Sequence, residues 1–426
     1  MSEDACRKYE QLLKTELILS QGCTEPAAIA FVSAVCRQNM TSFPERVVIS
    51  CSGNLFKNAK SVMIPNTDAL KGIGAACVCG FVSGEAELKL EILRSINEER
   101  LRRVHRLLEN PFCEVKLLRS PEKLHIIAEG FAEDEHVLAE LTHDHTHIRR
   151  IERNGETVFS DEAAADIANT EALYAALNPA DIVAYADTAD LSGEVGDVLR
   201  QQLSCNVAIC REGMTNDWGS CIGKLMKGGS DDVEKLAAAF AAAGSDARMS
   251  GCAMPVVINS GSGNQGITVT APVYVYATAM GLPEEKLLRG LIVSNLMSLY
   301  QKRLIGKLSA YCGAVTAGCA AGAAICYLRG GNAAQVESAF TNASASISGM
   351  FCDGAKPSCA AKIATSVTMG ILGQKMALTG HDLLPGDGIV GATPKDTVES
   401  VGRLAREGLT DIDDLILEIM YSTLPC

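Results

Sequence analysis

Two cysteines flank a segment that contains both glycine and proline. In Phe351–Ala360 (FCDGAKPSCA), Cys352 and Cys359 enclose a stretch where a continuous helix is disfavoured, so we expect a loop that lets the two sulfurs converge. Ser358 suits the N-cap of a helix that begins at Cys359, and a helix dipole stabilises a thiolate there. Lys356 would favour thiolates further. These features predict a pair of metal ligands.

A second pair, Cys312 and Cys319, has the same separation. Four cysteines could form a structural zinc site or a closed cluster. However, Ser309–Tyr327 is predicted to be one helix, which would place these two thiols about 10 Å apart along its axis. We therefore expect only one of them to join the loop cysteines, which gives three ligands and one open position. The alternative, that all four are packing cysteines, stays open because the usual C-x-x-C spacing is absent.

Cys23 lies in QGCTEPAAIA, directly before a helix that Pro26 suits as a first residue. A helix N-terminus lowers the pKa of a thiol and would make Cys23 a usable base or nucleophile. The neighbouring Glu25 would oppose this effect unless its side chain points elsewhere. A buried cysteine beside a helix cap fits the same residues.

Two glycine-rich segments contain a literal G-x-G-x-x-G, within Asn259–Gly266 (NSGSGNQG) and Gly386–Gly391. A dinucleotide site needs a strand, the loop and then a helix, whereas the β-branched run after the first segment stops at Pro272, so a nicotinamide site is not expected. Consecutive Gly and Ser amides can instead hold a carboxylate, although a flexible connector is the simpler alternative. The candidate substrate-binding residues are Ser260, Ser262, Gly263 and Asn264 here, Asn54, Lys57 and Asn58 in the polar segment Ser52–Lys60, and Lys356.

Three histidines alternate at 143, 145 and 147 in a run that resembles a strand. Side chains on one face of a strand are spread by roughly 7 Å per step, which is too far for three ligands of one ion. We expect His143, His145 and His147 to lie on a surface or hairpin face.

The hydrophobic pattern predicts a predominantly helical α+β protein, with a large helical catalytic domain and a small α+β domain inserted near the N-terminal third. We assign residues 1–85 to the N-terminal part of the catalytic domain, 86–160 to the small domain and 161–426 to the helical domain with the candidate cluster cysteines. The predicted strands are Arg46–Ser52, Cys113–Leu118, His125–Gly130, Val137–Thr142 and His145–Ile151. The predicted helices after residue 160 are Ala163–Leu177, Asp181–Ala189, Val195–Arg211, Asp231–Ala243, Glu284–Ile305, Ser309–Tyr327, Ala333–Met350, Cys359–Thr379 and Ile412–Tyr421.

Composition narrows the class of protein. The net charge of −13 argues against a nucleic-acid partner, which would require a basic surface. No segment resembles a signal peptide or a convincing membrane span, so we expect a cytoplasmic protein with no membrane partner. Its 17 cysteines would then be reduced rather than paired in disulfides.

Five motifs together resemble a known family. QGCTEPAAIA, SGNLFKNAKSVMIP, MPVVINSGSGNQG, FCDGAKPSCAAK and GDGIVG occur in the order found in the L-cysteine desulfidases, relatives of the iron–sulfur L-serine dehydratase α-chain. The resemblance covers roughly residues 10–395. It implies a [4Fe–4S] cluster with three cysteine ligands and one open iron, and the matching positions are Cys312, Cys352 and Cys359. It also implies that Cys23 is the catalytic base and that Cys319 only packs.

The resemblance further implies β-elimination of L-cysteine to hydrogen sulfide, ammonia and pyruvate through aminoacrylate. The open iron would bind the leaving sulfur, and Cys23 would remove the Cα proton. A small amino acid is the expected partner, no pyridoxal phosphate is expected, and the Ala-rich helices permit a homodimer. An iron–sulfur L-serine dehydratase would use the same site, although no extra β-unit is obvious. A non-catalytic metal or cluster sensor and a zinc-stabilised scaffold are further alternatives.

Overall fold

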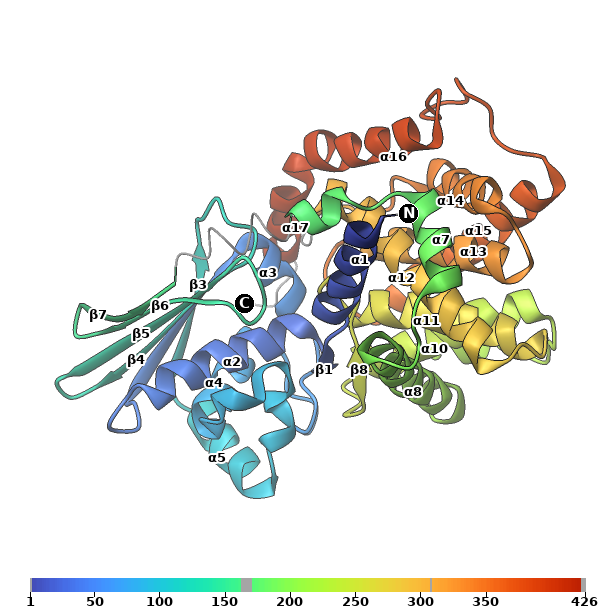
Figure 1. The fold of residues 1–426 in the computed structure, drawn as a ribbon. Helices are drawn as coiled ribbons and strands as arrows, with labels where there is room; N and C mark the ends of the chain where they lie inside the picture. The colour runs from blue at the N-terminus through green and yellow to red at the C-terminus, as the bar shows by residue number, and fades with distance from the viewer. Residues whose placement is uncertain (1, 162–170, 307–308, 423–426) are drawn as a thin grey trace.

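The chain folds into a sheet unit and a helical unit that lie side by side (Figure 1). The computed structural model describes residues 2–161, 171–306 and 309–422. Helices dominate, and one six-stranded sheet lies at one side of the molecule, so the predicted α+β class is confirmed. The predicted helix Ala163–Leu177 lies partly outside the described residues.

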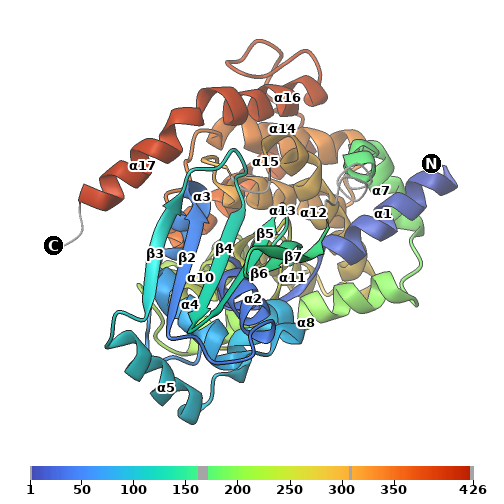
Figure 2. The same ribbon diagram turned by 90° about the vertical axis from the view of Figure 1, so that its left-hand side faces the viewer.

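The sheet has the strand order β3-β2-β4-β5-β6-β7 (Figure 2). Strands β2 and β3 are parallel, and every other neighbouring pair is antiparallel. Burial alternates along β4, as expected when one face of a sheet is covered. The covering helices are α2 (Thr24–Gln38) and α4 (Gly72–Ser83), and α5 (Glu98–Leu108) packs on α4. The strands are β2 (Arg46–Ser52), β3 (Cys113–Leu118), β4 (His125–Ala132), β5 (Glu135–Thr142), β6 (Ile148–Arg153) and β7 (Glu156–Ser160).

The core of the sheet unit extends across the expected domain boundary at residue 85. It draws on buried residues from Ala27 to Ile151, because β2 lies between β3 and β4 and because α2 packs on α4. Helices α2 and α4 cross so closely that a Cβ atom at Gly80 would overlap the carbonyl oxygen of Ala30. The sequence shows a strand at 46–52 but not its partners, so the sheet unit was expected to begin only at residue 86.

The helical unit is built mainly from small side chains. Gly322 of α13 meets the backbone of Gly370 of α15, and this close approach explains how a chain with 5% aromatic residues fills its core. Its helices are α1 (Glu3–Glu16), α7 (Pro179–Thr188), α8 (Glu194–Thr215), α9 (Ile222–Lys227), α10 (Val233–Met249), α11 (Gly263–Ala279), α12 (Glu284–Ile305), α13 (Gly313–Leu328), α14 (Ala333–Ile347), α15 (Cys359–Thr379) and α16 (Pro394–Arg403).

Two connections join the units. Strands β1 (Leu19–Gln21) and β8 (Pro255–Val257) pair antiparallel directly before the Cys23 and Asn259–Gly266 segments. The last helix, α17 (Thr410–Ser422), follows α16 back to α3 (Gly53–Ala59) in the sheet unit (Figures 1 and 2). The short connector Ala86–Ser95 is a 3-10 helix.

The sequence-based prediction failed for the segment after Asn259. Residues 263–279 form one helix, α11, with Pro272 in its interior, whereas we expected an extended run that ended at this proline. The helix is almost wholly buried, so packing outweighs the strand preference of its β-branched residues. The hydroxyls of Thr268 and Thr270 donate to helix carbonyls four residues back, at 2.7 Å each.

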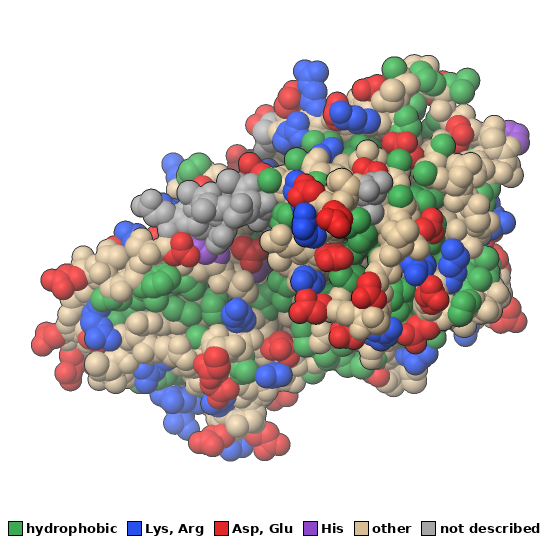
Figure 3. Space-filling model, in the orientation of Figure 1, with side chains coloured by type: hydrophobic (Ala, Val, Ile, Leu, Met, Phe, Trp, Pro, Cys, Tyr) green, Lys and Arg blue, Asp and Glu red, His purple; other side chains and the backbone are tan. Residues whose placement is uncertain are grey.

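The surface of the described residues shows no strong charge segregation on the face in Figure 3, where acidic and basic side chains are interspersed. None of the described helices combines the length and apolarity that crossing a bilayer would need. Every cysteine that the structure describes is a free thiol.

Candidate active site

A short backbone pairing brings Cys312 and Cys352 together. The amide of Cys312 donates to the carbonyl of Met350 at 3.0 Å, and that of Cys352 donates to Ala310 at 2.6 Å. The helix expected over 309–327 begins only at Gly313, because residues 310–312 take part in this pairing. Cys312 is therefore the N-cap of α13 rather than a residue inside it.

Cys359 reaches the same place from the start of α15. The loop between Cys352 and Cys359 forms as predicted, and the Cys359 thiol lies 3.6 Å from the carbonyl oxygen of Gly354. Gly354 has φ +95°, and a Cβ atom there would lie 2.5 Å from the carbonyl oxygen of Lys57. A glycine is thus required where the loop meets α3. Ser358 occupies the N-cap, but its side chain makes no capping hydrogen bond.

The electrostatics of the three thiols show that they share one environment. Burial, and then the neighbouring Cys352 and Cys359, raise the pKa of Cys312 to about 12. Burial also raises the pKa of Cys359, with Cys352 adding to the effect. Burial lowers the pKa of the Lys302 ammonium to about 8, although Cys352 and Cys312 oppose this shift. Lys302 is thus a buried cation whose charge interacts with two of the three thiols.

Cys319 points away from this group. It is fully buried within α13, and its thiol interacts with Ser344 of α14. The structure therefore brings Cys312 to the loop cysteines and leaves Cys319 in the core.

The three thiols fit an iron–sulfur cluster better than a single metal ion. Among the described residues, no three His, Cys, Asp or Glu side chains converge closely enough to hold one ion. A cluster needs less convergence because each thiolate binds a different iron, and thiolate is the ligand type that such clusters use. A structural zinc site would need four ligands around one atom. Lys302 and Lys362 lie near enough to offset the charge of thiolates at Cys312 and Cys352.

Cys23 forms a hydrogen-bonded pair with Glu25. Cys23 is the N-cap of α2, and its thiol donates to Oε2 of Glu25 at 3.0 Å. Nδ2 of Asn58 donates to the other carboxylate oxygen at 3.1 Å. Burial, and then the charge of Glu25, raise the pKa of Cys23 well above its usual range, while Arg248 opposes them. The predicted lowering of this pKa is therefore wrong, because Glu25 points at the thiol and both are buried.

Cys23 also packs beside the cysteine loop. It shares a small apolar cluster with Val62 and Met249, against which Ala355 and Cys359 pack. The candidate base and a candidate cluster ligand thus belong to one site.

The loop Asn259–Gly266 lies between these two regions. Thr24 Oγ1 donates to the carbonyl of Gly261 at 2.9 Å, next to Cys23. On the other side, a Cβ atom at Gly313 would lie 2.6 Å from the side chain of Gln265. The loop therefore contacts both the Cys23 turn and the start of α13.

Five helices begin at this site without a side-chain N-cap. Their dipoles favour negative charge at these ends, although the first two amides of α15 already donate to the carbonyls of Lys356 and Pro357. Helices α1, α5, α7 and α16, away from this site, are instead capped by a Ser, Asn or Thr side chain. The five site helices and their N-cap residues are α2 (Cys23), α3 (Ser52), α11 (Ser262), α13 (Cys312) and α15 (Ser358).

The predicted substrate-binding residues have different surroundings. Lys57 is buried and forms an ion pair with Asp413 of α17, while Lys356 pairs with Asp353 of its own loop. Asn58 is held by Glu25 through its amide nitrogen. Ser262 and Gly263 form the start of α11. Buried side-chain oxygens without a hydrogen-bond partner among the described residues occur at Asn54, Asn58, Ser260 and Asn264.

His145 was not predicted to belong to the site. Residues 143–147 form the turn of the hairpin between β5 and β6, which agrees with the predicted hairpin, but His145 is only 3% exposed and is therefore not a surface residue. A Cβ atom at Gly261 would lie 3.1 Å from its Cε1, and its Nε2 has no described partner. His143 and His147 lie near Glu122 and Asp161 instead.

Arg248 is the second residue that sequence reasoning missed. It is buried at the end of α10, and its Nε donates to the carbonyl of Gly22 at 3.1 Å, directly before Cys23. The sequence did carry a signal, since Arg248 is the one arginine in the Ala-rich run 237–249.

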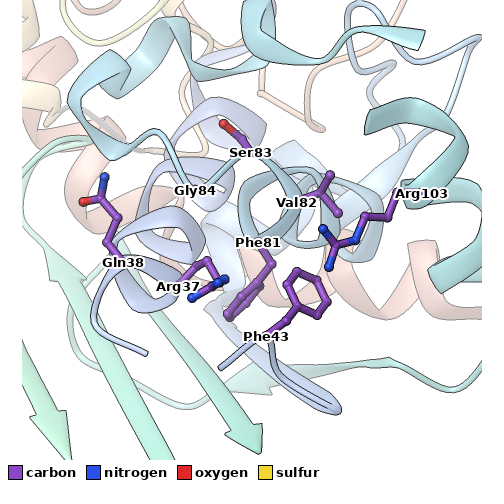
Figure 4. Close-up of a pocket in the computed structure, with 8 residues that line it drawn as sticks. All are labelled: Arg37, Gln38, Phe43, Phe81, Val82, Ser83, Gly84 and Arg103. Carbon is purple, nitrogen blue, oxygen red and sulfur yellow. The ribbon is translucent and has the colours of Figure 1, made fainter. Parts of the chain in front are cut away.

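A pocket of about 340 Å³ lies elsewhere, among α2, α4 and α5 (Figure 4). The guanidinium of Arg103 stacks on the ring of Phe43 there, 3.8 Å from the ring centroid. None of the predicted site residues lines this pocket.

Comparison with known proteins assigns the family. The family described as "Serine dehydratase alpha chain" matches residues 87–418. A UPF0597 protein of Lachnoclostridium phytofermentans is 45% identical over 98% of this chain and 100% of its own length. One of Finegoldia magna is 42% identical over 97% of this chain and 99% of its own, and one of Aeromonas hydrophila is 34% identical over 96% and 94%. The chain therefore belongs to the serine dehydratase alpha chain family.

Proposed function

We propose that the chain is an iron–sulfur lyase that eliminates hydrogen sulfide from L-cysteine and yields pyruvate and ammonia. The observation that carries this proposal is that Cys23 and Cys359 pack in one small apolar cluster, which also contains Val62 and Met249. A proton acceptor and a candidate cluster ligand would then belong to one site and act on neighbouring atoms of one small substrate.

Cys312, Cys352 and Cys359 would hold a [4Fe–4S] cluster. When bound, it would supply an open iron that acts as a Lewis acid on the leaving sulfur. The uncapped starts of α13 and α15, together with Lys302 and Lys362, favour the thiolate form of these ligands.

Cys23 and Glu25 would carry out the proton transfers of the reaction. The thiol already donates to Oε2 of Glu25, so the carboxylate can accept its proton and leave Sγ as a thiolate. The thiolate then removes the Cα proton of the substrate, a double bond forms between Cα and Cβ, and the Cβ–S bond breaks so that the sulfur leaves as hydrosulfide. The proton that Glu25 accepted passes to the hydrosulfide to give hydrogen sulfide, which returns Cys23 to the thiol and Glu25 to the carboxylate. Asn58 holds Glu25 in position from the other side. Aminoacrylate leaves the site and hydrolyses to pyruvate and ammonia.

Dehydration of L-serine is the second candidate function, and the family match favours it. Serine differs from cysteine only in its leaving atom, so the same residues would serve. Sulfur is the softer ligand for iron, which supports cysteine as the substrate.

The test uses protein reconstituted with iron and sulfide without oxygen. We expect sulfide and pyruvate from L-cysteine in proportion to bound iron, and C23A should retain the iron but lose turnover. Pyruvate from L-serine alone would assign the protein as a dehydratase. Bound iron without turnover of either amino acid would support a cluster sensor, and failure to bind iron would contradict the proposal.

A further inference from the structure

Arg248 is a buried cation for which the described residues supply no anion. The residue is 2% exposed, and within the described residues its side chain makes one hydrogen bond, from Nε to the carbonyl of Gly22. Its Nη2 is buried without a partner in the described part of the chain. The nearest acid in sequence, Asp246, instead accepts from the amide of Gly223 at 2.9 Å. A charge buried in this way is costly unless an anion pairs with it, so the position calls for an anionic ligand.

The guanidinium spans two parts of the site. Its Nε donates a hydrogen bond to the carbonyl of Gly22, the residue before Cys23, and a Cβ atom at Gly263 would overlap the same nitrogen. Gly263 is the first residue of α11, whose amides have no side-chain cap. Ser260 adds a buried hydroxyl without a described partner on the same loop. A guanidinium and a helix N-terminus both bind carboxylates, and here the guanidinium lies against the first residue of the helix.

The other buried cations at the site have different roles. Lys57 already pairs with Asp413, and Lys302 lies beside the cysteines that would become thiolates. Arg248 is therefore the buried cation left for the substrate. The competing anions are the Cys23 thiolate, on which Arg248 acts as well, and the buried Glu25 carboxylate beside it.

We propose that Arg248, together with the start of α11, binds the α-carboxylate of the substrate, an assignment that rests on the proposed amino-acid substrate. Its link to Gly22 would place Cα next to Sγ of Cys23. Pairing the carboxylate with a guanidinium also stabilises the negative charge that develops at Cα as the proton leaves. Specificity for an α-carboxylate follows, because a ligand that lacks it would leave Arg248 unpaired.

The test measures binding of two probes to the anaerobically reconstituted protein by calorimetry. 3-Mercaptopropionate carries a thiol and a carboxylate, whereas cysteamine carries a thiol and no carboxylate. We expect R248M to weaken binding of 3-mercaptopropionate by about 10- to 100-fold, as for loss of a charge-assisted hydrogen bond, and to change cysteamine binding by less than about threefold. R329M is the matched control, because Arg329 bonds to Gln374 away from the site, and it should change neither affinity.

The outcomes of these binding measurements distinguish a failure of this inference from a failure of the proposed function. Equal weakening of both probes, or of neither, would overturn the assignment and leave Arg248 as a counter-ion of Cys23 or a structural residue. If R248M does not fold, R248K keeps the charge but loses the bidentate fork, and it should still weaken 3-mercaptopropionate selectively. Wild-type protein that binds neither probe would also overturn it. Arg248-dependent binding of the carboxylate without turnover of cysteine would retain this inference and reject the proposed function.

Discussion

The thiol of Cys23 donates a hydrogen bond to the carboxylate of Glu25 across 3.0 Å, and both side chains are buried. This pair changes the role expected of the helix N-terminus at Cys23. The dipole of α2 favours the thiolate, but burial and Glu25 disfavour it more, so the pKa of Cys23 rises. A thiol of this kind becomes a base only if its proton has a nearby acceptor, and Glu25 is placed to be that acceptor.

The variant E25Q separates these two effects of Glu25. Glutamine keeps the contact with Asn58 but cannot take the proton, so turnover should fall by about 10²- to 10⁴-fold. The charge that raises the pKa of Cys23 is removed as well, so that pKa should fall and the thiolate should form at lower pH. Alkylation of Cys23 by iodoacetamide, followed by mass spectrometry, should therefore be faster in E25Q at a fixed pH.

The controls are iron content and a distant glutamate. E25Q should bind as much iron as the wild type, and E337Q on α14 should change neither turnover nor alkylation. Turnover of E25Q near the wild-type rate would show that Cys23 acts without Glu25.

The ligand set predicts which cysteines hold iron. Under the proposed ligand set, replacement of Cys312, Cys352 or Cys359 by alanine should abolish the visible absorbance of the cluster and remove most of the bound iron, because each would bind a different iron. C319A should keep both, since Cys319 packs in the core between α13 and α14. Iron lost equally in C319A, with comparable folding by circular dichroism, would contradict this ligand set.

The local part of this site was predictable from the sequence, and the long-range part was not. Gly354 and Pro357 break the helix within one motif, so the loop between Cys352 and Cys359 could be predicted. The choice of Cys312 depended on a family resemblance, because its pairing with the Cys352 segment joins residues about forty positions apart. Arg248 was missed for the same reason, since only the folded chain shows that its charge has no partner.

In the fold too, elements with a clear local pattern were predictable, and those that depend on long-range packing were not. The limits of α12 and α15 were predicted to the residue, because each has a clear helical period and a clear end. Helix α11 was not predicted, because its β-branched residues and Pro272 indicate a strand locally and only burial on all sides stabilises the helix. Local sequence patterns did not predict the partners of β2 in the sheet either.

The ion pair between Lys57 and Asp413 should make the C-terminal helix important for stability. Lys57 is 1% exposed, whereas the Asp413 side chain is 17% exposed. D413N leaves a buried ammonium without its counter-ion and should lower the free energy of unfolding by about 3 kcal/mol. K57M leaves the carboxylate nearer water and should cost less. Urea unfolding of both variants measures this asymmetry, and a larger loss in K57M would contradict it.

Asp246 should make stability depend on pH. Asp246 belongs to α10, and its side chain is buried against the start of α9. There Oδ2 accepts a hydrogen bond from the amide of Gly223, and Oδ1 has no described partner. Burial raises its pKa from 3.8 to about 6, although the α9 amides oppose the shift. The folded state therefore disfavours the ionised form. Stability from this group is fully present below about pH 4 and is lost as the pH rises through about 6.

The variant D246N should remove this dependence, because asparagine keeps an acceptor for Gly223 but does not ionise. Between pH 4 and pH 7 the wild type should lose about 3 kcal/mol of unfolding free energy relative to D246N, from a shift of about two pKa units at about 1.4 kcal/mol each. Urea unfolding of the metal-free protein at several pH values measures the difference. D231N, which changes an exposed aspartate in the turn before α10, should follow the wild type. Parallel curves for D246N and the wild type would show that Asp246 titrates alike in the folded and unfolded chains.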